Sequence, residues 1–283
     1  MKYREPKVVA ELCANHGGDM DTAKRMIRMA EICGVDVCKL QKRDLRMQAL
    51  SNPNLYHEPH PNPVNAFGET YLKHREALEF TIEQHMELKK YIESFGMEYS
   101  SSVWDVPSAI EIAALQPPFI KVPSACNQQY ATMQILKEHY GGDIHISLGI
   151  TDKTELSNLV SFWKGQLDRV VFYHCTTTYP LFAIDAHLLE ITDLLRIGAK
   201  DVGFSNHHSG IALDLEAQAL GASWFEHHVT LDRMSKGTDH IAALEFTGLR
   251  ALVRDLKEGF LALKFKPEEE CEAETIQRAK LKI

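Results

Sequence analysis

The chain has 283 residues, of which 45% are hydrophobic, so it is long enough to form one large domain with a substantial core. Its 31 Lys and Arg against 39 Asp and Glu give a formal net charge of −8. Because basic residues occur only as scattered pairs, this balance argues against nucleic acid and against an anionic membrane as partners. An anion bound by this protein must therefore be held by a local cluster of basic groups.

The cysteines and the N-terminus bear on the compartment. The six cysteines contain no CxxC pair, and most lie in apolar runs, where a free thiol behaves as a small hydrophobic residue. The first predicted strand begins close to Met1, without a charged and apolar leader, and no apolar run reaches about 18 residues. We therefore expect a reducing, cytoplasmic location.

Short apolar runs alternate with amphipathic segments along the chain, a pattern typical of repeated βα units that close a parallel sheet. Helices are predicted over 21–34 and 209–221, with Gly34 and Gly221 in C-cap positions. We predict an α/β fold, a (β/α)8 TIM barrel over residues 1–265, followed by a short charged extension over 266–283. The predicted strands are residues 8–14, 35–41, 97–103, 119–125, 143–149, 169–176, 201–207 and 223–231.

Residues 42–70 form one long irregular piece that is rich in Asn, Pro and His. A connection of this length is too long for a passive βα loop. We therefore expect it to be a functional loop over the carboxyl ends of the strands.

Two lysines, Lys39 and Lys121, lie in predicted strands that are otherwise apolar. A buried ammonium group is costly unless an anion compensates it, and for either lysine alone a structural ion pair with Glu11 is the favoured interpretation. Together, with small residues at the strand ends, they favour a cradle for phosphate or carboxylate. These small residues are Ser102, Ser124, Ser147, Gly149 and Ser205.

Paired histidines close the last two predicted strands. Imidazoles at the tips of neighbouring strands can converge on one divalent metal and leave positions open for a substrate, which makes His207 and His228 the candidate pair. Their neighbours His208 and His227 should face the other side of an extended strand and support the pair. The alternative is that these histidines are satisfied core residues. Glu11 adds a carboxylate to the same ring, as a lysine partner or as an acid/base group.

Seven motifs follow one another at the strand ends between residues 8 and 240: AELCANHGGDMDTAKRMI, DVCKLQ, IKVPSA, HISLG, HCTTTYP, GFSNHHSG and FEHHVTLDR. Together they resemble the N-acetylneuraminate (sialic acid) synthases, a family of metal-dependent TIM-barrel enzymes. The resemblance implies a transferase that condenses phosphoenolpyruvate (PEP) with an aldose to give a 3-deoxy-2-ulosonic acid and phosphate.

The resemblance also implies roles for individual residues. It makes His207 and His228 the ligands of a divalent metal, Mn²⁺ with Mg²⁺ or Co²⁺ as alternatives, and Glu11 an active-site carboxylate. The residues expected to hold PEP are Lys39, Ser102, Lys121, Ser124, Ser147, Gly149 and Ser205. By the resemblance, the residues expected to face the sugar are Asn15, Gln41, Tyr179 and Asp239. His74 and Arg75, in the continuation of the 42–70 loop, are expected to join them as part of a lid that this loop supplies.

Three features depart from the family pattern. Cys126 occupies the position of an acidic residue that would join Glu11, Lys39 and Lys121 in catalysis, and a neutral thiol is a poor base near pH 7. Asn206 replaces an aspartate that could tune the neighbouring histidine. The family's C-terminal antifreeze-like domain is not found, so we expect an altered acceptor, such as a sugar without the acetamide group, with the 42–70 loop as a lid.

Two other classes of protein would share some of these features. A metal-dependent hydrolase would also use histidines at the ends of strands, but would need a carboxylate beside them and has little use for two buried lysines. A barrel that binds sugar or phosphate without turnover is compatible with Cys126. For the synthase we expect the small-molecule substrates PEP and an aldose as partners, and a homo-oligomer, a dimer or tetramer, with helix faces available for a dimer contact.

Overall fold

Eight parallel strands close into a barrel in the computed structural model, which describes residues 3–268 and 271–282. Neighbours in the chain are neighbours in the barrel, and β1 closes it by pairing with β8. The strands are β1 (Lys7–Glu11), β2 (Val37–Lys42), β3 (Glu98–Val103), β4 (Phe119–Val122), β5 (Asp143–Ser147), β6 (Val170–Cys175), β7 (Asp201–Asn206) and β8 (Trp224–His228).

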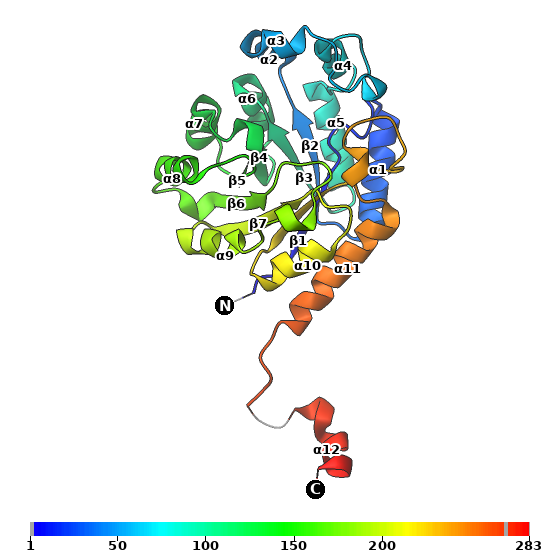
Figure 1. Ribbon diagram of the computed structural model, residues 1–283, viewed down its shortest axis with the longest axis vertical. Coiled ribbons are helices and arrows are strands. Elements are labelled where there is room, and N and C mark those ends of the chain that lie inside the picture. Colours follow the sequence, from blue (N-terminus) through cyan, green and yellow to red (C-terminus); the bar gives the residue numbers. More distant parts are fainter. Residues whose placement is uncertain (1–2, 269–270, 283) are drawn as a thin grey trace.

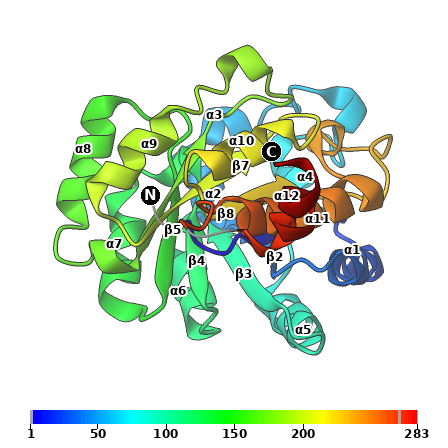
Figure 2. The ribbon, with the colours of Figure 1, turned by 90° about the horizontal axis from the view of Figure 1, so that it is seen from below.

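Helices surround the strands (Figures 1 and 2). The helices that follow strands around the barrel are α1 (Met20–Cys33), α5 (Ile82–Glu93), α6 (Val106–Ala114), α7 (Tyr130–His139), α8 (Lys153–Phe162), α9 (Glu190–Leu194), α10 (Ala212–Ala219) and α11 (Phe246–Ala262). The remaining helices are α2 (Leu45–Ser51), α3 (Pro53–Tyr56), α4 (Tyr71–Glu76) and α12 (Thr275–Leu281).

The predicted barrel is confirmed, with differences at the ends of its elements. β1 ends at Glu11 rather than at residue 14, because the backbone turns into the left-handed region at Cys13, with φ of 47°. Helix α1 begins where the Asp19 carboxylate accepts the Thr22 backbone N–H, and it ends at Gly34 in the left-handed conformation. The helix predicted over 209–221 is shorter, Ala212–Ala219.

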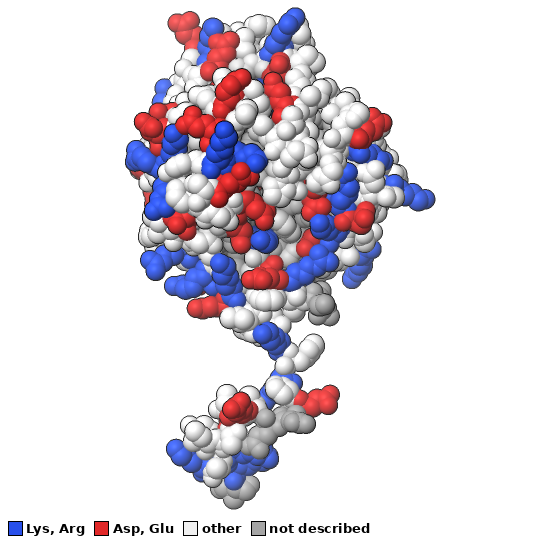
Figure 3. All heavy atoms as spheres, turned by 180° about the vertical axis from the view of Figure 1, so that it is seen from behind, with Lys and Arg blue, Asp and Glu red and all other residues white. Residues whose placement is uncertain are grey.

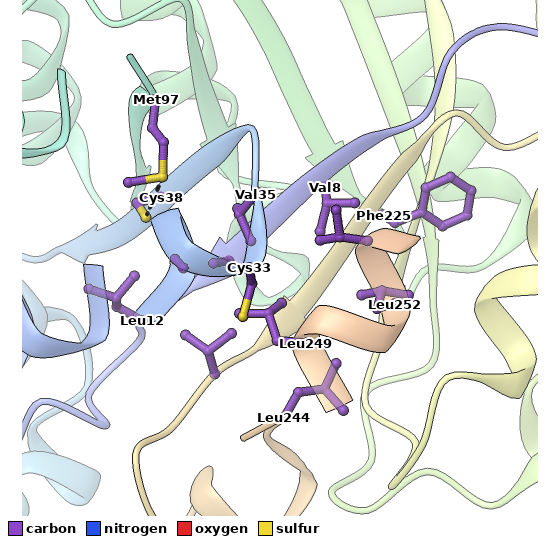
Figure 4. Close-up of a cluster of buried hydrophobic side chains, with 14 of the residues drawn as sticks. Val8, Leu12, Cys33, Val35, Cys38, Met97, Phe225, Leu244, Leu249 and Leu252 are labelled. Carbon is purple, nitrogen blue, oxygen red and sulfur yellow. Dashed lines mark hydrogen bonds between the residues drawn. The ribbon is translucent and has the colours of Figure 1, made fainter. Parts of the chain in front are cut away.

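The largest apolar cluster lies between the outer faces of the strands and the helices that cover them. Figure 4 shows part of it, where Val8 of β1 and Phe225 of β8 lie near Leu249 and Leu252 of α11. Each of these four side chains is fully buried. Truncating one buried leucine of this kind to alanine typically costs about 2–5 kcal/mol. This packing holds the strands, and therefore the residues at their ends, in fixed positions.

The segment predicted as one irregular loop over 42–70 contains short helices instead. Helix α2 is capped by the Asp44 side chain, α3 by Asn52 and α4 by Thr70, each of which accepts a backbone N–H of the first turn. The segment lies at one end of the barrel, at the top of Figure 1. It therefore forms a structured cover rather than a loose connection.

The C-terminal helix α12 lies apart from the barrel in Figure 1. Acidic and basic side chains are interspersed over the face shown in Figure 3, so that face has no large surface of one charge sign. Among the described residues, no helix combines the length and the apolar character that spanning a bilayer requires.

Candidate active site

Two adjoining cavities lie at the carboxyl ends of the strands. The inner cavity, of about 100 Å³, extends down to Glu11, Lys39, Lys121 and Glu226. The outer cavity, of about 220 Å³, lies under the α2–α4 segment. Gln41, Trp104, Tyr179 and His228 line both cavities, so the two are continuous.

The inner cavity contains a cluster of four buried charged groups. Lys39 forms an ion pair with Glu11, and its Nζ lies 3.6 Å from Glu226 Oε2. Lys121 Nζ lies 2.5 Å from Glu226 Oε1. All four side chains are at most 5% exposed, so water screens these charges poorly. The expected ion pair with Glu11 is therefore found for Lys39, whereas Lys121 pairs with Glu226 instead, because β8 brings that carboxylate next to it.

The pKa values within this cluster move in different directions. Burial raises the pKa of Glu11, and Glu226 adds to that effect against the opposing influence of Lys39. For Glu226 burial acts in the same sense, but Lys121 and Lys39 outweigh it and bring its pKa to about 2. Glu11 therefore takes up a proton more readily than an ordinary glutamate. Burial and Lys39 lower the pKa of Lys121, against the opposing influence of Glu226. When Glu11 is protonated, the two lysines face a single carboxylate, and the cavity favours an anion.

Glu226 was missed by the sequence analysis, although a signal for it exists. Side chains two positions apart on a strand face the same side, so Glu226 must share the face of His228. The register of β7 and β8 pairs Ser205 with Glu226, which places this carboxylate beside a residue already predicted for the cavity. Glu226 could supply the carboxylate that a hydrolase would need, but it pairs with Lys121 and lies 3.6 Å from Lys39.

Hydroxyl groups complete the wall of the inner cavity. Lys39 Nζ donates to Ser102 Oγ at 2.7 Å, and Lys121 Nζ lies 3.4 Å from Ser205 Oγ. Ser124, Ser147 and Ser205 also line this cavity. The Gly149 backbone N–H donates to Ser124 Oγ at 3.0 Å, and a Cβ atom at Gly149 would approach Thr177 Oγ1 to 2.0 Å. Only glycine fits there without displacing a cavity residue.

The outer cavity collects every residue that was predicted to face a sugar. Its lining contains Asn15, Gln41, His74, Arg75, Tyr179 and Asp239. Further lining residues come from the α2–α4 segment and from Arg43, whose guanidinium stacks on Trp104 at 3.8 Å. Arg75 Nε is buried without a hydrogen-bond partner. This cavity thus offers amide, hydroxyl and charged groups to a polar ligand.

Residues suited to a divalent metal meet where the two cavities join. The rings of His207 and His228 have centroids 5.5 Å apart, and donor atoms of Cys13, His228 and Asp239 lie within 4.8 Å of one another. Burial lowers the pKa of His228 to about 3, so its ring is neutral at pH 7, and its Nδ1 is buried without a partner. Nitrogen and carboxylate donors of this kind fit a divalent ion such as Mn²⁺.

His207 is less ready to bind a metal than His228. Its Nδ1 lies 3.1 Å from the Thr176 carbonyl oxygen, which requires a proton on Nδ1 and leaves Nε2 as the metal-binding atom. Burial lowers its pKa, but Cys175 outweighs that effect, so the pKa is raised overall. A metal must therefore compete with a proton at His207, but not at His228.

The neighbouring histidines face away from this junction. His208 Nδ1 lies 2.9 Å from the Leu181 carbonyl oxygen. His227 Nε2 donates to Asp214 Oδ2 of α10 at 3.0 Å, and Asn206 Nδ2 donates to the same oxygen at 2.8 Å. Asn206 stands in place of the family's aspartate at the end of β7, but Asp214 of helix α10 brings a carboxylate to the same place.

Cys126 lies outside both sets of cavity-lining residues. It is 2% exposed and belongs to an apolar cluster with Val103 and Met133. Burial raises the pKa of its thiol to about 12. The structure therefore does not bring Cys126 together with Glu11, Lys39 and Lys121.

Comparisons with known proteins identify relatives of this chain over most of its length. The model of the NeuB family matches residues 26–267. N-acetylneuraminate-9-phosphate synthase of Homo sapiens is 34% identical over 251 residues, which are 88% of this chain and 69% of that protein. N,N'-diacetyllegionaminic acid synthase of Campylobacter jejuni is 28% identical, over 89% of this chain and 75% of that protein.

A solved structure supports the fold. The crystal structure of N-acetylneuraminic acid (sialic acid) synthetase from Leptospira borgpetersenii superposes with a TM-score of 0.82 at 24% identity, covering 98% of this chain and 93% of that one. The sequence motifs, the barrel and the family match lead to one conclusion. The chain belongs to the NeuB family, the sialic acid synthase family that its motifs resemble.

Proposed function

We propose that this protein condenses PEP with an aldose to give a 3-deoxy-2-ulosonic acid and inorganic phosphate. The observation that carries the proposal is the buried pair Lys39 and Lys121 in a cavity that opens directly into a second, polar cavity. Such a pair of connected sites suits a small phosphorylated acid as the donor and a larger hydroxylated acceptor. The names of the relatives, which are synthases of nine-carbon sugar acids, support the same reaction class.

In this proposal PEP occupies the inner cavity. The ammonium groups of Lys39 and Lys121 offset the charge of its phosphate and carboxylate, and the serine hydroxyls donate hydrogen bonds to its oxygens. As the C–O bond to phosphate breaks, the leaving group gains charge that the same donors stabilise. The cluster exchanges part of its internal pairing with Glu226 for contacts with the substrate.

The acceptor aldose occupies the outer cavity, with its aldehyde end directed at the junction near His228 and Tyr179. Asn15, Gln41, Asp239 and Arg75 are placed to receive its hydroxyl groups. Helix α4 contributes His74 and Arg75, so the α2–α4 segment acts as the cover proposed for the 42–70 region. Holding both reactants in adjoining cavities supplies much of the rate by orientation.

The bond changes balance without an external reductant or oxidant. The methylene carbon of PEP forms a bond to the aldehyde carbon, and the oxygen of a water molecule adds to the carbon that bears phosphate. Cleavage of the C–O bond then expels phosphate and leaves a 2-keto acid, while the aldehyde oxygen receives a proton. We assign this proton exchange to Glu11, because burial raises its pKa above that of an ordinary glutamate and Gln41 Nε2 donates to its Oε1 at 2.9 Å.

His207 and His228 would hold the divalent metal, Mn²⁺ in this proposal, with Asp239 beside them. When bound, such an ion supplies Lewis acidity towards the aldehyde carbonyl. The neutral His228 ring and the orientation of His207 by Thr176 support this assignment. The cytoplasmic location and the dimeric or tetrameric state stay predictions of the sequence.

Several acceptors are compatible with this arrangement. In N-acetylneuraminate-9-phosphate synthase, the relative that is 34% identical, the terminal phosphate of the product must enter with the acceptor, since PEP releases its own phosphate. The decisive experiment incubates the protein with PEP, Mn²⁺ and one of three sugars: N-acetylmannosamine, its 6-phosphate or mannose. We expect phosphate release only when both substrates are present, together with a new acid whose mass is the sum expected for condensation. Phosphate release from PEP alone would contradict the proposal, as would substrate binding without a new acid.

A further inference from the structure

Cys13 occupies a special position at the junction of the cavities. It follows β1, its φ of 47° lies in the left-handed region, and its side chain is only 6% exposed. A side chain in this backbone conformation is strained, and glycine would adopt it without strain. The Cys13 side chain nevertheless lines the outer cavity beside His228 and Asp239.

The groups around the Cys13 sulfur are those of a metal site. Donor atoms of Cys13, His228 and Asp239 lie within 4.8 Å of one another. The imidazole of His228 is buried, and its Nδ1 lacks a hydrogen-bond partner. An unsatisfied buried nitrogen calls for an explanation, and a bound ion at this ring supplies one. Three different donor types therefore converge from β8 and from two separate loops.

We propose that Cys13 is a sulfur ligand of the divalent metal and forms with His228 and Asp239 a site of mixed sulfur, nitrogen and oxygen donors. The inference rests on the metal dependence proposed above and deepens it by adding a thiolate to the histidine ligands. His207, which directly follows the end of β7, has its ring beside that of His228.

The change at sulfur on metal binding is a simple exchange of a proton for the metal. The S–H bond breaks, a sulfur–metal bond forms, and the proton leaves to water; the oxidation states do not change. Cys13 Sγ donates to Asp239 Oδ2 at 2.7 Å, so loss of this proton to water frees both the sulfur and the carboxylate oxygen for the metal. Burial and the neighbouring Asp239 raise the pKa of the Cys13 thiol, so without a metal the sulfur keeps its proton, and Gln41 Nε2 donates to Cys13 Sγ at 3.0 Å.

A thiolate ligand changes which metals the site prefers. Thiolates are soft ligands that favour ions such as Zn²⁺ and Co²⁺, whereas sites of oxygen donors suit Mg²⁺ and Mn²⁺. We therefore expect wild-type protein to bind Zn²⁺ and Co²⁺ more tightly than Mn²⁺, and Mg²⁺ most weakly. Loss of the sulfur should reduce this preference at least about tenfold, the size of effect that even outer-shell partners of a metal have.

The test reads metal binding directly, without PEP or an aldose. Metal-free protein is titrated with Co²⁺, and the near-ultraviolet absorption that reports sulfur-to-cobalt charge transfer is recorded. We expect the band in the wild type and its loss in both Cys13→Gly and Cys13→Ser. Cys13→Gly suits the left-handed backbone and keeps the protein folded, which circular dichroism verifies, so loss of the band reports the sulfur alone.

Cys175 provides the matched control. Among the described residues, it is the other cysteine that lines the inner or the outer cavity, with Sγ 4.0 Å from His207 Nδ1. The band should persist in Cys175→Ala. A band that survives in Cys13→Gly, that disappears in Cys175→Ala, or that is absent from the wild type would overturn the inference. Turnover by a protein without the band would overturn this inference alone, whereas a band in a protein without turnover would contradict only the proposed function.

Discussion

The inner and outer cavities are built in different ways. The inner cavity is lined mainly by strand residues whose neighbours are set by the register of the barrel, with Glu11 opposite Lys39 and Ser102 opposite Lys121. The outer cavity takes much of its wall from the short helices of the 42–76 segment and from the loop that contains Asp239. A hydrogen-bonded sheet holds a donor site rigidly, while short capped helices can differ between relatives without disturbing the barrel. The donor site should therefore be the common part of the family and the acceptor site the variable part.

Metal removal should have the largest effect, because the histidines lie where the two cavities meet. Dialysis against a chelator is expected to reduce product formation at least about a thousandfold, since a metal that polarises a carbonyl supplies several kcal/mol of stabilisation. PEP binding, measured by calorimetry, should persist because Lys39 and Lys121 do not depend on the metal. Mn²⁺ should restore turnover. Equal rates before and after chelation would contradict the proposal that a metal bound at the junction of the cavities takes part in the reaction.

Lys121→Gln should impair the use of PEP in the inner cavity without changing the binding of the acceptor in the outer cavity. The change removes a charge from the phosphate site and leaves Glu226 with Lys39 at 3.6 Å as its remaining lysine partner. We expect kcat/KM for PEP to fall about a hundredfold to a thousandfold. The free energy of unfolding should drop by about 3–5 kcal/mol, the usual result of breaking a buried ion pair. Lys164→Gln, at an exposed position, should change neither quantity.

Arg75→Gln should affect the outer cavity alone. Arg75 lines the outer cavity, and a hydrogen bond from its guanidinium to the acceptor would contribute about 1.5–3 kcal/mol. The KM for the acceptor should rise about tenfold or more, while the KM for PEP stays within twofold of the wild type. Arg25→Gln on the exposed side of α1 is the control. A parallel rise in both KM values would show that the cavities are not separate binding sites.

As the pH falls, the stability contributed by His74 of the outer cavity should be lost before that contributed by Glu226 of the inner cavity. Burial, assisted by Arg75 and His60, lowers the pKa of His74 to about 4, whereas an unfolded chain protonates this ring near its ordinary value of 6.5. The unfolded state therefore binds more protons between these values, and stability falls as the pH decreases from about 6.5 to about 4. In urea unfolding between pH 7 and pH 4, the midpoint of His74→Gln should change less with pH than that of the wild type.

The inner cavity supplies the contrast in the same titration. The pKa of Glu226 lies at about 2, below its ordinary value of 4.5, so its contribution is complete above that ordinary value and is lost only as the pH falls towards 2. Glu226→Gln should lower stability by a similar amount at pH 7 and at pH 5. A strong pH dependence of that difference over this interval would contradict the charge distribution in the cluster.

The sequence predicts the strand-borne part of the site better than the rest, for physical reasons. Lys39 and Lys121 stand out because a charge inside an apolar run needs a partner, and His228 stands out at a strand end. Glu226 lies two positions before His228 and faces the same side of the strand. The two adjacent histidines suggested a metal site, so the carboxylate beside them was not predicted. Cys13 reads as a small apolar residue until the backbone is known to turn it towards Asp239.

Residues held by helices or loops are harder to predict. Helices α2 and α3 have only 7 and 4 residues, so their stability comes from caps and packing rather than from a long periodic pattern. Asp214 reads as an ordinary polar position on α10, and its carboxylate is nevertheless fully buried. Its partners Asn206 and His227 lie on two different strands, and that convergence is visible only in three dimensions.

The Asp214 carboxylate links the adjacent strands β7 and β8 to helix α10 outside the barrel. His207 and His228 each follow directly after one of the linked residues, so the gap between the two imidazoles depends on where α10 sits. Helix α10 in turn is tethered to α11, where Gln218 Nε2 donates to the Leu256 carbonyl oxygen at 2.6 Å. Substitutions on the barrel's outer shell, far from any reactant, can therefore retune the spacing of the metal-binding rings.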